Sequence, residues 1–414
     1  MKKLFFASAL ALGALCSCSN DDVAPVADNG VGEESGLVPV QLTLNRPAVV
    51  ATVRGNGTVG GVDEASNKWN GEDLYVFMMC KQKVDDNGNA SPAFEESRWM
   101  YSENVESTPV PQINFYNELL KAPVDVASGD LYSTTVGDYD PQFPKFYPMD
   151  ASLHDFFAYH IDNAMLDEDG DGKPDFTKNV DKITVPFKMD GSQDLMAGKA
   201  IPSADVTGDC SDKGLLYSAK SARGGVIPNI QMKHLLTRFT FEVEGGSNAN
   251  GLIVNKIEVM SKTSGELIAA YSPTLLSEGA EVLDPEDLIS FDEEKTRLEL
   301  KQRPEAGGAL EPITPQTLVV AEDGTSTVFP VGEALMVAPG EEVYNVYITT
   351  TQRTGSLDHM HEQKGEITVV GGAVAGTSYK VRIKLYSASE IQIQTTLSAW
   401  VDGGETIPVD PSDF

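Results

Sequence analysis

The segment 167–175, DEDGDGKPD, has the spacing of oxygen ligands that a calcium ion requires. Hard Ca²⁺ binds several oxygens around one point, which a loop supplies from carboxylates at positions 1, 3, 5 and 9 and a backbone carbonyl at position 7. Those positions are held by Asp167, Asp169, Asp171, Asp175 and Lys173. Position 12, where an EF-hand has its bidentate glutamate, is Lys178. The pattern favours a Ca²⁺ staple with an affinity of roughly 10⁻⁴–10⁻³ M over a solvated turn of Asp and Gly, and no other cofactor is required.

A cysteine at the end of the first apolar run is a candidate for lipidation. Two lysines precede a run of about a dozen apolar residues, which is too short to span a bilayer and is typical of an export signal. A lipoprotein signal needs an aliphatic residue three before the cysteine and a small residue just before it. Leu15 and Ser17 satisfy this for Cys18, and Cys16 fits less well. We expect residues 1–17 to be a lipoprotein signal and Cys18 to be acylated; an ordinary secretory signal is the alternative.

The next residues, 18–36, are acidic, rich in glycine and free of aromatics, so they predict a flexible tether of about 20–25 Å. Loss of two lysines with the signal changes the formal charge of the chain from −31 to −33. So acidic a chain repels nucleic acid, and we expect no nucleic-acid partner. The two remaining cysteines, Cys80 and Cys210, are compatible with a disulfide without implying one.

A second candidate metal site lies in LDHMHEQ (357–363). On a strand, His359 and His361 share a face, as two zinc ligands would need, with Glu362 beside them. No third ligand is evident nearby, so the sequence favours a polar hairpin.

Three aromatic residues, Trp69, Trp99 and Tyr101, could form a platform that stacks on sugars, although aromatics of β-sandwiches more often belong to the core. The segment GNGTVG (55–60) matches the G-x-G-x-x-G pattern of dinucleotide-binding loops. Because the βαβ unit that this pattern needs is missing, we interpret the segment as a flexible loop. Because no nucleophile elbow, zinc-protease motif or Cys–His pair is evident, we expect no enzymatic activity.

The elements that must position these residues are short strands. Period-two alternation recurs in LVPVQLTL (37–44), RFTFEVE (238–244), YKVRIKLY (379–386) and IQIQTTLSA (391–399), with turn residues between the runs. Many such strands predict an all-β chain of antiparallel sandwiches, and its length predicts two domains. We place an N-terminal β-sandwich domain at 37–228 and a C-terminal one with a short tail at 229–414.

Several stretches resemble the fimbrillins, the pilus-subunit lipoproteins of Bacteroidales. They are the lipoprotein signal followed by acidic residues, KFYPMDASLHDFFAYHI (145–161), DLMAGKA (194–200), MKHLLTRFTFEVE (232–244), LMVAPGEEVYNVYITT and SAWVDGG (398–404). The resemblance rests on the order and spacing of these stretches, which are distributed over most of the chain. It implies two transthyretin-like β-sandwich domains behind a lipidated tether.

The resemblance also implies assembly by strand exchange. A trypsin-like protease cuts after an arginine that follows the first strand, and a strand of another subunit fills the vacated groove. The first strand would be residues 37–45. Arg46 precedes a proline that hinders such a protease, so Arg54 is the expected cleavage site, with an unprocessed loop arginine as the alternative. After Trp400, two prolines and four acidic residues argue against a long donor strand, so either 391–400 is the donor or the subunit is a tip or anchor piece.

These expectations together describe a surface-exposed lipoprotein of the cell outer membrane. It would be a structural subunit or accessory of a fimbria and would support adhesion to a host or bacterial surface ligand. Its partners would be other fimbrial subunits, through strand exchange, and the outer membrane, through the lipid anchor. The alternative is a surface glycan-binding lipoprotein of a sugar-uptake system.

Overall fold

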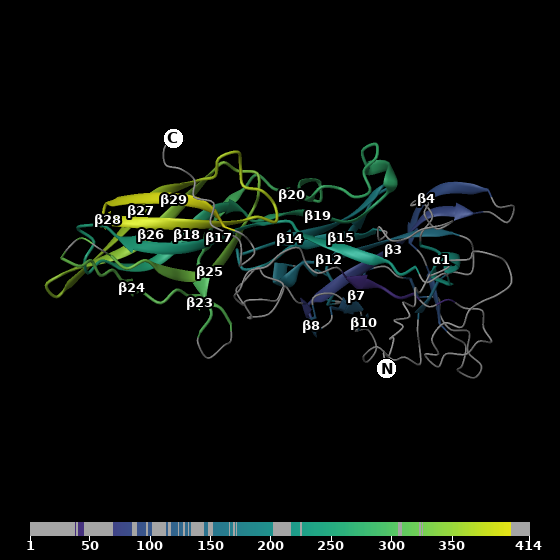
Figure 1. Cartoon of the computed structure of the whole chain (residues 1–414), viewed down its shortest axis with the longest axis horizontal. Helices are drawn as coiled ribbons and strands as arrows, with labels where there is room; N and C mark the ends of the chain where they lie inside the picture. The colour runs from purple at the N-terminus through teal and green to yellow at the C-terminus, as the bar shows by residue number, and fades with distance from the viewer. Residues whose placement is uncertain are drawn as a thin grey trace, which may run out of the picture.

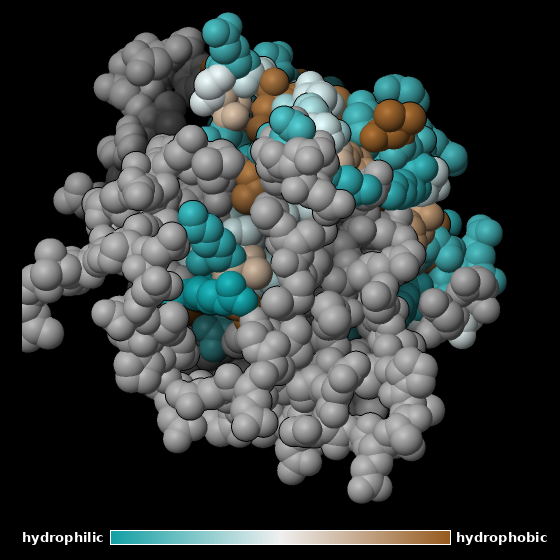
Figure 2. All heavy atoms as spheres, turned by 90° about the vertical axis from the view of Figure 1, so that its right-hand side faces the viewer, coloured by the Kyte–Doolittle hydropathy of each residue, from teal (hydrophilic) through white to brown (hydrophobic). Residues whose placement is uncertain are grey.

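The computed structural model describes residues 38, 40–44, 69–84, 89–96, 98–101, 113–114, 117–122, 124–126, 129–130, 132–133, 145–147, 152–164, 166–168, 170, 172–201, 217–223, 226–304, 309–322, 324 and 326–398. The molecule is elongated, with strands of the C-terminal half at one end and strands of the N-terminal half at the other (Figure 1). Seen from the N-terminal end, hydrophilic residues make up most of the coloured surface, with small brown hydrophobic patches between them (Figure 2).

A nine-stranded sheet organises the N-terminal half. Its order is β10 (Tyr132–Ser133), β7 (Glu118–Lys121), β3 (Asp73–Val84), β12 (Leu153–His160), β15 (Met196–Ile201), β16 (Asn229–His234), β1 (Thr43–Leu44) and β9 (Gly129–Asp130), with β4 (Ala90–Glu96) paired to β3. The central strand β12 is buried at every position. Because both faces of the sheet are covered there, neighbouring apolar residues such as Phe156 and Phe157 are buried on opposite faces, and the polar residues His154, Asp155 and His160 are buried with them.

A four-stranded sheet covers one face of the large sheet. Its order is β13 (Thr177–Lys178), β14 (Lys182–Lys188), β19 (Ser264–Tyr271) and β20 (Ile289–Phe291). Alternate residues of β3 and β12 point to opposite faces. Phe77 and Phe157 pack against Val185 and Leu267 of the small sheet, whereas Phe156 points to a separate core on the other face. The N-terminal half is therefore a sandwich with a second apolar layer on its outer side.

The C-terminal half is a second sandwich. One sheet has the order β25 (Phe329–Val337), β17 (Thr237–Gly245), β28 (Ser378–Ser387), β29 (Glu390–Ser398), and the other has the order β21 (Lys295–Glu299), β18 (Ile253–Lys262), β26 (Val343–Thr354), β27 (Leu357–Thr368), with β24 (Gln316–Thr317) paired to β18. Phe239, Val381 and Ile383 of the first sheet share a core with Val259 and Ile348 of the second. The expected all-β architecture with two sandwiches is confirmed.

The chain does not divide between the sandwiches at the boundary expected at 228/229. β16 begins at Asn229 and pairs with β15 of the N-terminal sheet. β18 lies in the C-terminal sandwich, and only Thr263 separates it from β19, which pairs with β14 in the N-terminal sandwich. Sheet membership depends on these long-range pairings, which the alternation of apolar residues does not encode.

The segment between β14 and β15 fastens the two sandwiches together. The Met189 amide donates to the Thr263 carbonyl, and the Met336 amide donates to the Gly191 carbonyl, each at 2.8 Å. Lys301 forms an ion pair with Asp190 at 2.6 Å. These contacts join the two halves through backbone as well as side chains.

The remaining described elements are small. Two-stranded and three-stranded pairings are formed by β2 (Trp69–Asn70) with β8 (Val124–Val126), by β11 (Lys145–Phe146), β5 (Arg98–Tyr101) and β6 (Ile113–Asn114), and by β22 (Lys301–Gln302) with β23 (Glu311–Pro312). Helical segments among the described residues are α1 (Ala219–Arg223), η1 (Asp162–Ala164), η4 (Pro273–Leu275) and η5 (Pro285–Asp287). Within the described residues, no helix has the length and apolar character needed to span a membrane.

Candidate functional site

The first strand is inserted between two strands that are far from it in sequence. β1 runs parallel to β16, with Thr43 opposite Asn229, and antiparallel to β9, with Thr43 opposite Asp130. The Thr43 amide donates to the Pro228 carbonyl at 3.0 Å, and the Val38 carbonyl accepts from the Tyr147 amide at 2.8 Å. Within the described residues 38 and 40–44, the regular ladder covers Thr43 and Leu44, which is less than the strand expected at 37–45.

Side chains hold this segment more firmly than its short ladder. Val38, Leu42 and Leu44 are 4%, 5% and 0% exposed and belong to the apolar core on the outer face of the large sheet. Gln41 is exposed, so the alternation expected from the sequence is confirmed. Burial of such side chains stabilises by about 1.5–3 kcal/mol each, or roughly 5–9 kcal/mol for the three, as an upper bound. The segment therefore fills an apolar slot.

Two tyrosines belong to the same core as the inserted strand. Tyr147 and Tyr217 are buried, and neither hydroxyl has a hydrogen-bond partner among the described residues. Burial raises the pKa of both hydroxyls well above the ordinary value, and for Tyr147 the neighbouring Tyr217 adds to the effect. Both side chains are therefore neutral and bring uncharged hydroxyl groups into the core that holds the first strand.

The residues expected to be processed fall outside the described residues. This holds for the lipidation candidate Cys18, for both arginines Arg46 and Arg54, and for the loop at 55–60. Cys80 is buried in β3, whereas Cys210 also lies outside the described part of the chain.

The Asp-rich loop is partly described, because Asp169 and Asp171 lie outside the described residues. The carboxylate of Asp167 accepts from the Gly170 amide at 2.7 Å and from the Gly172 amide at 3.0 Å. Both glycines have positive φ, of 75° and 80°, which a turn of this kind requires. The backbone therefore folds the loop around the first of the expected ligands.

The far end of the loop is closed onto its beginning and onto the body. The Asp175 amide donates to the Leu166 carbonyl at 2.8 Å, and Asp175 accepts from the Glu168 amide at 2.9 Å. Pro174 is buried, and its carbonyl accepts from the Asn117 side chain at 3.1 Å. Lys173, whose backbone carbonyl was the expected fifth ligand, is half-buried. Among the described residues, no group of three His, Cys, Asp or Glu side chains is placed to hold a metal ion.

The expected polar hairpin is formed by β26 and β27. His359 and His361 are exposed on one face of β27, opposite Gln352 and Thr350. Glu362 points to the other face, so it does not join the histidines.

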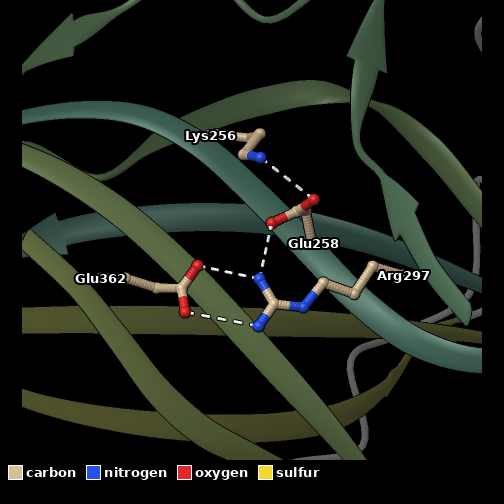
Figure 3. Close-up of polar contacts among 4 residues, drawn as sticks. All are labelled: Lys256, Glu258, Arg297 and Glu362. Carbon is tan, nitrogen blue, oxygen red and sulfur yellow. Dashed lines mark hydrogen bonds and ion pairs between the residues drawn. The ribbon is translucent and has the colours of Figure 1, made fainter.

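Glu362 instead belongs to a charge cluster that the sequence did not reveal. Its carboxylate accepts two hydrogen bonds from Arg297 of β21, at 2.8 and 3.3 Å. Figure 3 shows Arg297 between Glu362 and Glu258, with Lys256 on the other side of Glu258. Arg297 also stacks at 3.6 Å on the ring of Tyr347 in β26, so one guanidinium ties four strands together. These hydrogen bonds hold the pKa of the Glu362 carboxyl below its ordinary value.

The aromatic platform expected as an alternative loses one member. Trp69 is fully buried and is part of the same core as Leu44. It therefore cannot stack on a sugar. Trp99 and Tyr101 lie in β5, and nothing in the described part of the chain places their side chains.

The candidate donor segment occupies a place in the chain's own sheet. β29 pairs with β28 from Ile391 opposite Leu385 to Ser398 opposite Ser378. Ile391 and Ile393 pack against the C-terminal core. Residues 399–414 lie outside the described residues.

Comparison with known proteins finds no matching protein family and no matching curated protein. Among solved structures, the chain is similar to a candidate cell adhesion protein from Bacteroides ovatus, with 10% identity, a TM-score of 0.42, and coverage of 89% of this chain and 99% of that one. It is also similar to the tip fimbrial protein Mfa3 of Porphyromonas gingivalis, with 11% identity, a TM-score of 0.29, and coverage of 87% and 99%.

A third similar structure is the fimbrial anchor protein Mfa2 of Porphyromonas gingivalis, with 10% identity, a TM-score of 0.32, and coverage of 88% and 99%. Adhesion and fimbrial proteins are the kind of protein that the sequence resembles. At these identities and TM-scores the similarities by themselves assign neither a family nor a function.

Proposed function

We propose that this chain is a structural subunit or accessory of a cell-surface fimbria and supports adhesion. The observation that carries the proposal is the first strand, which lies in a slot of the large sheet with Val38, Leu42 and Leu44 buried. The resemblance of the sequence to fimbrillins gives this strand its role. It is the piece that is removed before assembly.

The slot has the chemistry that strand exchange requires. If residues 38–44 left, Asn229 and Ile230 of β16 would lose their partner strand on that side, and the apolar core beside them would be open. Unpaired backbone groups beside an apolar slot attract a new strand, which supplies backbone hydrogen bonds and alternate side chains. A donor with apolar residues at every second position would fit.

The anchor and the cut complete the proposal. Acylation at Cys18 holds the newly exported chain on the outer membrane, exposed at the surface. Cleavage after Arg54 then separates the body of the chain from the lipid and from the first strand, which leaves the slot vacant. The partners are then other fimbrial subunits. A chain that keeps its lipid serves as an anchor, and a chain without a free donor strand serves as a tip. The Asp-rich loop is proposed to bind Ca²⁺ as a staple near the sandwich, with no part in catalysis.

Mass spectrometry of the cell-surface form tests this function. We expect a fraction of the chain to begin at Gly55 and to run in oligomers, and an acylated Cys18 in any fraction that stays anchored. The variant Arg54→Gln should remain uncut, and Arg46→Gln, the matched control, should be processed normally. A surface form that is never cut and never oligomerises, while binding to a glycan array, would favour the sugar-uptake alternative instead.

A further inference from the structure

The hairpin of β26 and β27 has a tip that is exposed on both faces. Its turn consists of Gly355 and Ser356, with Thr354 opposite Leu357, and Gly355 has a φ of 65°. A two-residue turn with glycine first fits the tight type of hairpin in which the flanking pair is hydrogen-bonded. From Gln352 to Glu362 every residue is exposed, and Met360 is 70% exposed.

Two histidines of this tip form half of a metal site. His359 and His361 are about 6.7 Å apart along the strand and point to the same face. Imidazole nitrogens suit Zn²⁺, which takes four ligands in a tetrahedron, so two positions would remain open. The carboxylates nearest in sequence are engaged elsewhere, because Asp358 bonds to Arg353 and Glu362 to Arg297, each at 2.8 Å. The described part of the chain supplies no third ligand.

The same face carries buried polar atoms that have no hydrogen-bond partner among the described residues. Thr350, directly opposite His361, is fully buried, and its hydroxyl makes no hydrogen bond to a described residue. Gln363, the next residue on this face after His361, is 7% exposed and has an unpartnered side-chain oxygen. At this end of the hairpin, the side-chain oxygens of Thr350 and Gln363 therefore have no hydrogen-bond partner among the described residues.

No described strand pairs with the outer edge of β27. Of the strands that the structure describes, β26 alone pairs with β27. Hydrogen-bonded and non-hydrogen-bonded pairs alternate along an antiparallel ladder. Counting from the hydrogen-bonded pair at the turn, Met360 stands at a non-hydrogen-bonded pair with Thr351. Its N–H and C=O are therefore directed to the free edge, where an exposed strand is a template for another.

We propose that His359 and His361 bind Zn²⁺ together with the same two residues of a second copy of this chain, paired edge to edge through β27. In an antiparallel pairing around a two-fold axis at Met360, each Met360 forms a hydrogen-bonded pair with its equivalent. His359 of one copy then stands opposite His361 of the other, on one face, with Cβ atoms about 4.5–5.5 Å apart. Four imidazoles from two copies complete the tetrahedron.

Charge and exposure on the other face are compatible with this partner. The exposed Met360 side chains of the two copies would cover each other. Asp358 of one copy would face Glu362 of the other, and each carboxylate already has an arginine as its partner. Gln363 donates to the Ser387 carbonyl, at the end of β28 in the other sheet, at 3.1 Å, so the proposed pairing is confined to about residues 357–363. The proposal does not rest on the proposed function, since the hairpin is remote from the first strand.

Sedimentation velocity of the full chain, without any added polyhistidine tag, tests the proposal. In zinc chloride the molecular mass should double, with one zinc bound for two chains, and EDTA should reverse the change. His359→Asn combined with His361→Asn should leave the chain monomeric. Met360→Glu should abolish the dimer but keep weaker zinc binding at one ion per chain.

Lys364→Gln, on the outward face of the same strand, is the matched control and should dimerise like the native chain. Circular dichroism establishes that each variant is folded. The proposal is overturned if the native chain stays monomeric at saturating zinc, whether or not it binds the ion. It is equally overturned if the double histidine variant still dimerises.

Discussion

Replacement of Leu44 by alanine should loosen the first strand without unfolding the sandwiches. Leu44 is fully buried in the core of the slot, whereas the regular ladder of β1 has only two residues. A buried Leu→Ala change costs about 2–5 kcal/mol, because it removes apolar contacts and leaves a cavity. Since every 1.4 kcal/mol is tenfold, the population in which the strand is open should rise by about 30-fold to several thousand-fold.

Hydrogen exchange of the Thr43 amide measures this opening. That amide donates to the Pro228 carbonyl at 3.0 Å, so it exchanges only when the strand leaves its place. The matched control is Gln41→Ala, whose side chain is exposed, and its effect should stay within about 0.5 kcal/mol. Equal exchange in both variants would refute the idea that inward side chains, rather than the ladder, hold the strand.

Three further predictions concern other parts of the molecule. Gly191→Ala places a Cβ 2.7 Å from Leu335 at the junction of the sandwiches, whereas Gly279→Ala, with a similar positive φ, meets nothing within 4 Å. Urea unfolding should show that Gly191→Ala destabilises the chain by about 1–3 kcal/mol more than Gly279→Ala. Equal losses of stability would contradict the packing described for the junction. Arg297→Gln should raise the pKa of Glu362 toward the ordinary value of a glutamate, as followed by NMR titration. Because the pKa of Glu362 is lowered in the folded chain, the stability that this pair adds is present at pH values above the ordinary pKa of a glutamate. It is lost as the pH falls through the lowered pKa, so the free energy of unfolding of the variant should change less with pH in the acid range. Calcium at 10 mM should stabilise the native chain by about 1.4–2.7 kcal/mol if its affinity is in the extracellular range, and should not stabilise Asp167→Asn; no thermal shift in the native chain would exclude the staple.

The all-β class and the faces of the first strand could be predicted because they depend on local alternation. Val38 and Leu42 are buried and Gln41 is exposed, as a period of two requires. Sheet membership could not be predicted in the same way. β19 crosses back to the N-terminal sandwich one residue after β18 ends, and nothing local distinguishes it from a strand that stays.

The candidate sites divide along the same line. Strand periodicity predicts that His359 and His361 share one face of β27, and the polar sequence around them predicts the exposed hairpin in which they lie. The interaction of Arg297 with Glu362 joins residues on β21 and β27, with two strands between them. Only the order of strands in the sheet brings these charges together. The burial of Trp69 likewise depends on packing between distant segments.

The most direct test of the central claim asks whether a foreign strand can replace the first one. The full chain is cut with trypsin, and a labelled synthetic peptide of residues 37–45 is added in excess. We predict that the label enters the protein after cleavage and not before it, and that a peptide with Leu42→Asp and Leu44→Asp is excluded. Equal uptake of both peptides, or no uptake after cleavage, would contradict an exchangeable strand in the slot.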